Sequence, residues 1–213
     1  MNASAFYPLL MFTLAYAITP GPNNVMLAAS GATFGYRRSL PHMLGVCLGA
    51  ALMLILVGCG LLTAFERLPY FHTALKYLGA GYLVWLAWRI AGSQTVGSTG
   101  TPLQPLGFGQ AMAFQWVNPK SWIMAVGIVA TYTPHEGFYT HLWLTAVLLI
   151  VVSFPSISLW TLLGRMVARA LPSVTAVQRF NRSMAGLLLL SLYPLAAELW
   201  EYVGPWTHRV ASV

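Results

Sequence analysis

Hydrophobic residues occur along this chain in six long continuous runs that are separated by short polar segments. Crossing the roughly 30 Å hydrocarbon core of a bilayer takes about 20 helical residues, and each run reaches that length. The runs do not alternate as barrel strands do, so helices are the structure that can satisfy their backbone in lipid. The pattern predicts an all-α polytopic membrane protein with six transmembrane helices: Ala5–Ala29, Leu40–Phe65, Tyr70–Ile90, Gly107–Thr133, Leu142–Leu163 and Met184–Val203.

The polar segments divide the chain into two halves of three helices each. We expect one transmembrane domain over residues 1–213, with a first repeat at about 1–91 and a second at about 107–213. A Gly/Ser/Thr/Pro-rich linker over residues 92–106 joins them, and residues 164–183 form a basic connection before the last helix. Because each half has an odd number of spans, repeats of this kind must be inverted with respect to the membrane.

Proline-containing motifs break the first helix of each half deep inside its apolar run. The motifs are Thr19-Pro20-Gly21-Pro22-Asn23-Asn24 in helix one and Asn118-Pro119-Lys120 in helix four. A proline lacks an N–H and clashes with the carbonyl four residues back, so backbone carbonyls are freed at each break. Interrupted helices at corresponding positions of two halves indicate the binding site of a transporter.

A new half-helix begins after each break, with unpaired N–H groups and the positive end of its dipole. Since helices one and four run in opposite directions, their new N-termini face the middle of the membrane from opposite sides. Such a site suits a carboxylate, and the freed carbonyls suit an ammonium group. The predicted substrate is therefore a small zwitterionic amino acid, which carries both.

Lys120 lies about 20 Å into helix four, near the bilayer centre, where a lysine costs at least about 2.5 kcal/mol. Its partner could be a substrate carboxylate, a freed carbonyl or a neighbouring asparagine, and it could instead be a structural pin between the broken helices. Gln115 is one turn before Asn118 and is expected to face the same cavity. The candidate substrate-binding residues are Thr19, Pro20, Gly21, Pro22, Asn23, Asn24, Gln115, Asn118, Pro119 and Lys120.

Other polar residues inside the runs carry less information. Ser153-Phe154-Pro155-Ser156 interrupts helix five, and either lines the path or satisfies a proline kink. Among five scattered histidines, His42, near the inner start of helix two, is the one to follow. No acidic residue lies at the centre of a run, so the sequence does not reveal which residue carries a coupled proton.

Composition supports the membrane interpretation. Hydrophobic residues make up 58% of the chain and charged residues 7%, against about 25% charged in soluble domains, which excludes a soluble enzyme or a nucleic-acid partner. The net charge of +7 is then a signal of topology. Three basic residues fall on one face, and seven fall on the other: Arg37, Arg38, Arg89, Arg165, Arg169, Arg179 and Arg182. The positive-inside rule places both termini outside the cytoplasm.

Two rival functions of similar architecture each require residues that can be sought in this sequence. A membrane thiol-electron carrier needs a cysteine in each of helices one and four, whereas Cys47 and Cys59 both lie in helix two, about 18 Å apart along it. A divalent metal-ion permease needs clusters of imidazole, thiolate or carboxylate, whereas the chain has no Asp and dispersed histidines. No catalytic residue, cofactor or metal site is predicted, and both rivals remain alternatives.

Four motifs carry a resemblance over nearly the whole chain. They are residues 19–24, Gly35-Tyr36-Arg37, residues 75–86 (LKYLGAGYLVWL) and Asn118-Pro119-Lys120. In this order they resemble the lysine exporter (LysE) superfamily, and most closely its homoserine/threonine-exporter (RhtB) type. The motif of helix one and the stretch Trp85–Trp88 look like members that export cysteine and O-acetylserine.

The resemblance implies a multi-pass secondary transporter of the bacterial inner membrane that exports amino acids or their derivatives. We expect alternating access driven by an ion gradient, with the proton as the coupling ion. The partners are then the amino-acid substrate, the proton and the lipid bilayer. The sequence leaves open which amino acid is exported and whether the protein is a homo-oligomer.

Overall fold

The computed structural model describes residues 3–61, 69–92, 104–134, 136–171, 173–193 and 197. The described residues form α-helices and contain no strand, so the all-α class is confirmed. The helices are α1 (Ala3–Ile18), α2 (Pro22–Phe34), α3 (Tyr36–Leu56), α5 (Pro69–Ala91), α6 (Phe108–Phe114), α7 (Pro119–Tyr132), α8 (Phe138–Ala170) and α9 (Val174–Leu190). A π-turn, η1 (Val57–Leu61), extends α3, and a 3-10 turn, η2 (Gln115–Val117), follows α6.

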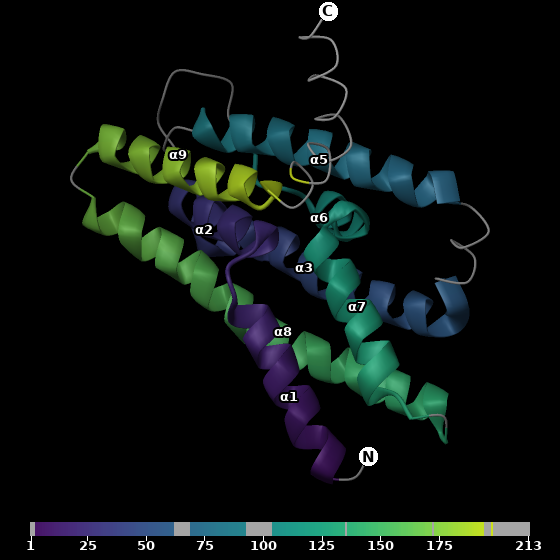
Figure 1. The fold of residues 1–213 in the computed structure, drawn as a ribbon. Helices are drawn as coiled ribbons and strands as arrows, with labels where there is room; N and C mark the ends of the chain where they lie inside the picture. The colour runs from purple at the N-terminus through teal and green to yellow at the C-terminus, as the bar shows by residue number, and fades with distance from the viewer. Residues whose placement is uncertain are drawn as a thin grey trace, which may run out of the picture.

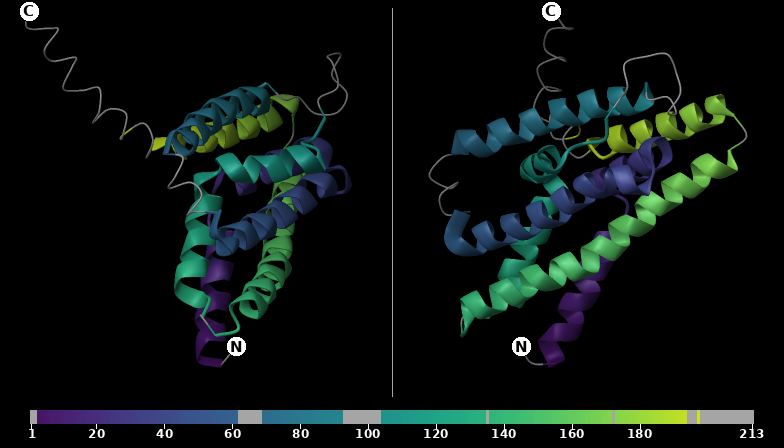
Figure 2. Two further views of the ribbon diagram at one scale, coloured as in Figure 1. Left: turned by 90° about the vertical axis from the view of Figure 1, so that its right-hand side faces the viewer. Right: turned by 180° about the vertical axis from the view of Figure 1, so that it is seen from behind.

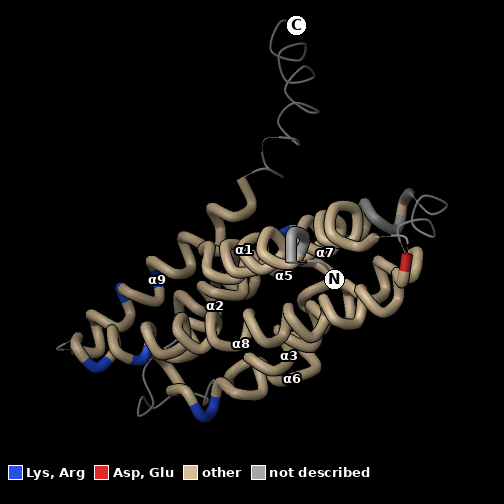
Figure 3. Tube along the Cα trace, turned by 90° about the horizontal axis from the view of Figure 1, so that it is seen from below, with Lys and Arg blue, Asp and Glu red and all other residues tan. Residues whose placement is uncertain are grey.

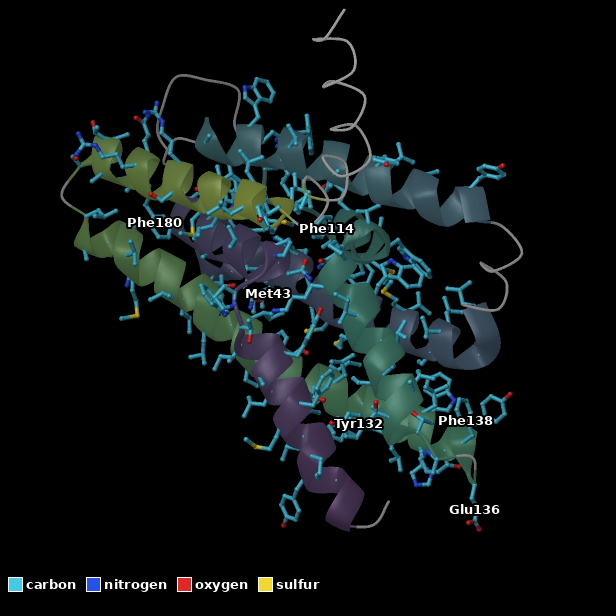
Figure 4. The ribbon with its side chains drawn as sticks, in the orientation of Figure 1. Met43, Phe114, Tyr132, Glu136, Phe138 and Phe180 are labelled. Atoms are coloured by element: carbon cyan, nitrogen blue, oxygen red, sulfur yellow. The ribbon has the colours of Figure 1, made fainter. Side chains whose placement is uncertain are left out.

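The helices pack in layers around α2 and α3 (Figure 1). The antiparallel pair α5 and α9 covers one side, and the long helix α8 crosses the other side, where it packs against both α2 and α3. The two further views in Figure 2 show α1 and α7 projecting together beyond this body, close to the first half of α8. Figure 4 places Met43 and Phe114 inside the bundle and Glu136 pointing away from it at the start of α8.

Both predicted helix breaks are present. The first helix ends at Ile18 and resumes at Pro22, and the fourth is interrupted by η2 and Asn118. Proline occupies the first position of each new half-helix, where its missing N–H costs nothing. In Figure 1, α1 runs toward the first break, while α2 and α7 run away from the breaks in opposite directions.

Several predicted boundaries were wrong. The basic connection 164–183 is mostly helical, because α8 continues to Ala170 and α9 begins at Val174. Nothing before Pro172 disrupts the α8 backbone, and Ser173 caps α9 by accepting a hydrogen bond from the Ala176 amide. The interval between the first two predicted spans, residues 30–39, shrinks to Gly35, whose φ of 79° is accessible to glycine.

Two described helices are long and apolar enough to span a membrane on their own, namely Tyr36–Leu61 and Phe138–Ala170. The first and fourth predicted spans are split by their breaks into shorter helices. The end of the sixth predicted span lies outside the described residues, as does most of the linker 92–106. Large apolar side chains such as Trp143, Val147 and Val151 are exposed along α8, which is typical of a face in contact with lipid.

Glycine permits the closest helix contacts. A Cβ atom added to Gly31 of α2 would lie 1.9 Å from the Thr161 carbonyl oxygen of α8, and one added to Gly164 would lie 1.9 Å from the Ala28 carbonyl oxygen. The two helices therefore cross backbone to backbone, as small residues allow in membrane proteins. A similarly close approach brings α3 and α6 together at Gly45, whose added Cβ would lie 2.3 Å from the carbonyl oxygen of the first residue of α6.

Arginine gathers at one end of the bundle, where α2 ends, α3 begins and α8 meets α9 (Figure 3). This arginine-rich end holds the seven residues that the sequence assigns to one side of the membrane: Arg37, Arg38, Arg89, Arg165, Arg169, Arg179 and Arg182. Glu136 lies at the opposite end. The structure therefore gathers at one end the arginines that the sequence assigns to one side of the membrane.

Candidate functional site

Lys120 joins the two helix breaks. Its ammonium group donates a 2.6 Å hydrogen bond to the carbonyl oxygen of Thr19, 101 residues away in the chain. The same nitrogen lies 4.6 Å from the centre of the Tyr16 ring, within range of a cation–π contact. A Cβ atom added to Gly21 would lie 2.7 Å from Cδ of this lysine, so glycine is the residue that lets the side chain pass.

The carbonyls freed at the end of α1 are bound by side chains. The Asn24 amide donates 2.9 Å hydrogen bonds to the carbonyl oxygens of Ala17 and Thr19. The Trp160 indole of α8 donates to the carbonyl oxygen of Ile18 at 3.3 Å. The break is thus held open by partners from α2, α7 and α8, which satisfy backbone oxygens that the helix no longer uses.

A pair of side-chain amides connects the two halves beside the lysine. Asn23 donates to Oε1 of Gln115 at 2.9 Å, and Gln115 donates back to Oδ1 of Asn23 at 3.3 Å. Gln115 is fully buried and also donates to the Ala111 carbonyl oxygen at 2.8 Å, while its Oε1 accepts from the Ser121 hydroxyl at 2.8 Å. This network fixes the start of α2 against the interruption of helix four.

The N-termini of α2 and α7 differ in how they are capped. Asn118 is buried, and its side chain accepts a 3.1 Å hydrogen bond from the Lys120 amide. Gly21 precedes α2 and has no side chain to serve as a cap, so the amides of the first turn of α2 have no such partner. The positive end of the α2 dipole therefore points toward the space occupied by the lysine side chain.

A cavity of about 40 Å³ lies between the breaks, with room for about three water molecules. Apolar side chains from α3, α7 and α8 form one wall of it: Val46, Ala50, Met124 and Ile157. Polar groups line the rest, including Ser121 and Ser153. Pro155 leaves α8 continuous, so the Ser153 segment lines the cavity without breaking its helix.

The structure brings most of the predicted site residues together. Those that line the cavity are Gly21, Asn23, Asn24, Gln115, Asn118 and Lys120. Thr19 contributes its carbonyl oxygen, whereas its hydroxyl bonds to its own helix at Ala15. Pro20 and Pro119 are exposed and Pro22 is buried at the start of α2, so the prolines shape the backbone and do not line the cavity.

Sequence reasoning missed three partners of the site, namely Tyr16, Ser121 and Trp160. Tyr16 and Ser121 adjoin the break motifs by one helical turn or less, so helical periodicity could have indicated that they face the same space. Trp160 lies in a different helix and carries no such local signal.

No acidic side chain faces Lys120 among the described residues. The chain has four acidic residues; Glu136 is exposed at the start of α8, and Glu66, Glu198 and Glu201 lie outside the described residues. Over the part of the chain that the structure describes, no group of three or more His, Cys, Asp or Glu residues could hold a metal ion. Cys47 and Cys59 are both free thiols, the first buried and the second exposed.

Comparison with known proteins gives consistent matches. The profile of the family described as LysE type translocator matches residues 14–196. A cysteine/O-acetylserine efflux protein of Klebsiella pneumoniae is 28% identical over 93% of this chain and 100% of its own length. Proteins of the same name match from Salmonella typhimurium, at 28% identity over 94% and 98% of the two chains, and from Escherichia coli O1:K1, at 33% over 78% and 84%. No solved structure matches the chain significantly.

Proposed function

The chain belongs to the LysE type translocator family, and we propose that it exports small zwitterionic amino acids of the cysteine and O-acetylserine class through the cavity between its two helix breaks. The resemblance read from the motifs is confirmed by the family match, and so is the prediction of an amino-acid exporter. Family members are integral proteins of the inner membrane, in agreement with the helical structure.

The position of Lys120 carries the proposal. Its ammonium group touches both breaks, yet among the described residues it donates only to the Thr19 carbonyl oxygen and meets no carboxylate. An ammonium group has three N–H donors, so two remain for an incoming anion. A lysine held in a membrane without a counter-ion has an unfavourable free energy, and a substrate carboxylate would supply the missing negative charge.

The rest of the cavity suits the other parts of an amino acid. The uncapped first turn of α2 would add backbone N–H donors to the carboxylate. When the lysine turns to that carboxylate, the Thr19 carbonyl oxygen and the Tyr16 ring become available to the substrate ammonium group. The short apolar wall that includes Val46 and Ala50 suits a small side chain such as that of cysteine.

The size of the cavity supports a mechanism of alternating access. A space of about 40 Å³ holds a few waters but no amino acid, so the cavity must widen before it can take a substrate. We place the two breaks in six spans that form two inverted repeats, about 1–91 and 107–213, with both termini outside the cytoplasm and the proton as the coupling ion. The opposite directions of α2 and α7, and the arginine-rich end, support this arrangement.

The test is counterflow of labelled cysteine into liposomes that contain the purified protein and unlabelled substrate. Lys120→Met removes a charge-assisted hydrogen bond to the substrate, worth about 1.5–3 kcal/mol, and should weaken apparent affinity about ten- to a hundredfold. Arg182→Met removes an exposed cation on α9 and serves as the matched control, with affinity unchanged. A Lys120→Met protein with normal affinity would show that the lysine is not a ligand.

A second experiment tests the break itself. Replacing Pro20 and Pro22 with alanine restores backbone N–H groups and allows α1 to continue into α2, which should abolish counterflow. Pro8→Ala is the control, because Pro8 lies within α1 and leaves the helix continuous. Normal counterflow in the double variant would remove the discontinuous helix from the proposed mechanism.

A further inference from the structure

A second cavity, of about 60 Å³, lies between α2, α3 and α5, and its lining includes Arg89 of the arginine-rich end. Its polar lining comes from Ser30 and Thr33 of α2, His42 of α3 and Arg89 of α5, and the segment 104–106 closes one side. The volume has room for about four water molecules. None of these residues belongs to the site between the breaks.

His42 is the unusual group in this cavity. Its side chain is 1% exposed, and neither ring nitrogen has a hydrogen-bond partner among the described residues. Burying an unpaired polar group costs roughly 1–3 kcal/mol, so such a group calls for a functional explanation or a bound water. Nearby hydroxyls are used elsewhere: Ser30 bonds to Ser39 at 2.7 Å, and Thr33 accepts from the amide of Asn181 at 3.3 Å.

The charged residues on the helices around this cavity are all basic, including Arg179 and Arg182 of α9, which packs against α2. Across the cavity, α5 presents Arg89, whose guanidinium lies 4.9 Å from the centre of the Trp85 ring. The helices α2 and α6 contain no charged residue, and residues 104–106 add none. On α3 itself the titratable residues are Tyr36, Arg37, Arg38 and Cys47, and on α8 they are Tyr139, His141, Arg165 and Arg169. None of these elements carries a carboxylate. Of the two titratable side chains that line the cavity, His42 and Arg89, the imidazole is the one whose ordinary pKa lies near neutral pH.

The two cavities are one helical turn apart along two shared helices. On α3, His42 lines the second cavity and Val46 lines the first, a separation of about 6 Å along the helix axis. On α2, Met26 lines the second cavity, whereas Asn23 and Asn24 line the first. A movement of α2 or α3 that opens one cavity therefore changes the other.

We propose that His42 is the residue that binds and releases the coupled proton, a role that rests on the proposed export function. Neutral imidazole suits the arrangement described here, in which the ring is buried and shares the cavity with Arg89. Imidazolium in the same place would add a second cation beside Arg89 with no carboxylate to balance it, so protonation favours an arrangement in which the ring gains contact with water. The ring takes up the proton while the protein faces outward and releases it while the second cavity is open, so the proton crosses the membrane in the direction opposite to the substrate.

The experiment compares the wild-type protein with His42→Gln in liposomes, using labelled cysteine in two assays. Counterflow without a pH gradient measures substrate movement, and efflux under an imposed pH gradient measures coupling. His42→Gln should keep counterflow within about twofold and lose at least about tenfold of the gradient-driven stimulation. His141→Gln is the matched control, since His141 bonds to the Gly137 carbonyl oxygen far from the cavity, and it should behave as wild type.

Each outcome distinguishes the two proposals. A wild-type protein without counterflow overturns the export function itself. Gradient-driven efflux by His42→Gln at the wild-type level, or equal loss in both assays from a folded variant, overturns the role of His42 alone. If His42→Gln does not fold, His42→Asn replaces it. A pH-sensitive dye trapped in liposomes that contain the wild-type protein then measures proton movement during export. Export that moves no protons overturns the inference.

Discussion

The crossing of α2 and α8 gives a sharp prediction, because the two backbones touch there. In Gly31→Ala the new Cβ would lie 1.9 Å from the Thr161 carbonyl oxygen, whereas close carbon–oxygen contacts lie at about 3.3–3.6 Å, so the helices must separate by more than about 1 Å. A backbone carbonyl cannot rotate away, which places the overpacking cost near the upper end of about 1–3 kcal/mol. Alanine has a higher helix propensity than glycine, which offsets about 1 kcal/mol of this cost, so the net loss of stability is about 2 kcal/mol.

Thermal unfolding in detergent, followed by tryptophan fluorescence, measures this loss. The midpoint of Gly31→Ala should fall by several degrees, and transport should fall with it, because displacing α2 moves Asn23 and Asn24 away from their partners. Gly186→Ala is the control: its Cβ would meet nothing within 4 Å on exposed α9, so the midpoint should hold or rise. Equal midpoints for the two variants would refute the backbone contact between α2 and α8.

Three further predictions concern caps and thiols. Asn118→Ala removes the cap of α7 and should cost about 0.5–2 kcal/mol in thermal unfolding, while Asn118→Ser, which can accept the same hydrogen bond, should cost less; equal losses would contradict the capping role. Ser173→Ala removes the cap of α9 and should cost about 1 kcal/mol without changing counterflow, since Ser173 lines neither cavity. In detergent, a maleimide should label exposed Cys59 and spare buried Cys47 until the protein unfolds, and rapid labelling of both would contradict the packing of α3.

Much of the candidate site could be predicted because proline and glycine act locally. The motif at residues 19–24 interrupts a helix wherever it is placed in an apolar run, and Asn118-Pro119 does the same. Lys120 was identifiable by the cost of its charge at that depth in the run. The helix ends at residues 164–183 were misjudged because polar and basic residues continue a helix as readily as they form a loop.

The partners of the site could not be predicted, since they depend on which helices meet. The choice of Thr19 as the acceptor for Lys120, and of Gln115 as the partner of Asn23, requires α2 and the fourth helix to face each other across 92 or more residues of chain. The role of Trp160 likewise depends on α8 lying against the end of α1, where the indole reaches the Ile18 carbonyl oxygen. The ring of His42 is notable only because it has no hydrogen-bond partner among the described residues, which the sequence could not show.

The sequence by itself determined that the chain is a helical membrane protein, where two of its helices break and which family it belongs to. Those properties follow from hydrophobic run length, from proline chemistry and from local motifs, all of which act over a few residues. The tertiary structure alone decided which groups fill the space between the breaks and that a second cavity lies one turn away. Both features depend on the packing of helices that are distant in the chain. Close contacts at glycine, such as that between Gly31 of α2 and the Thr161 backbone of α8, determine how closely these helices approach.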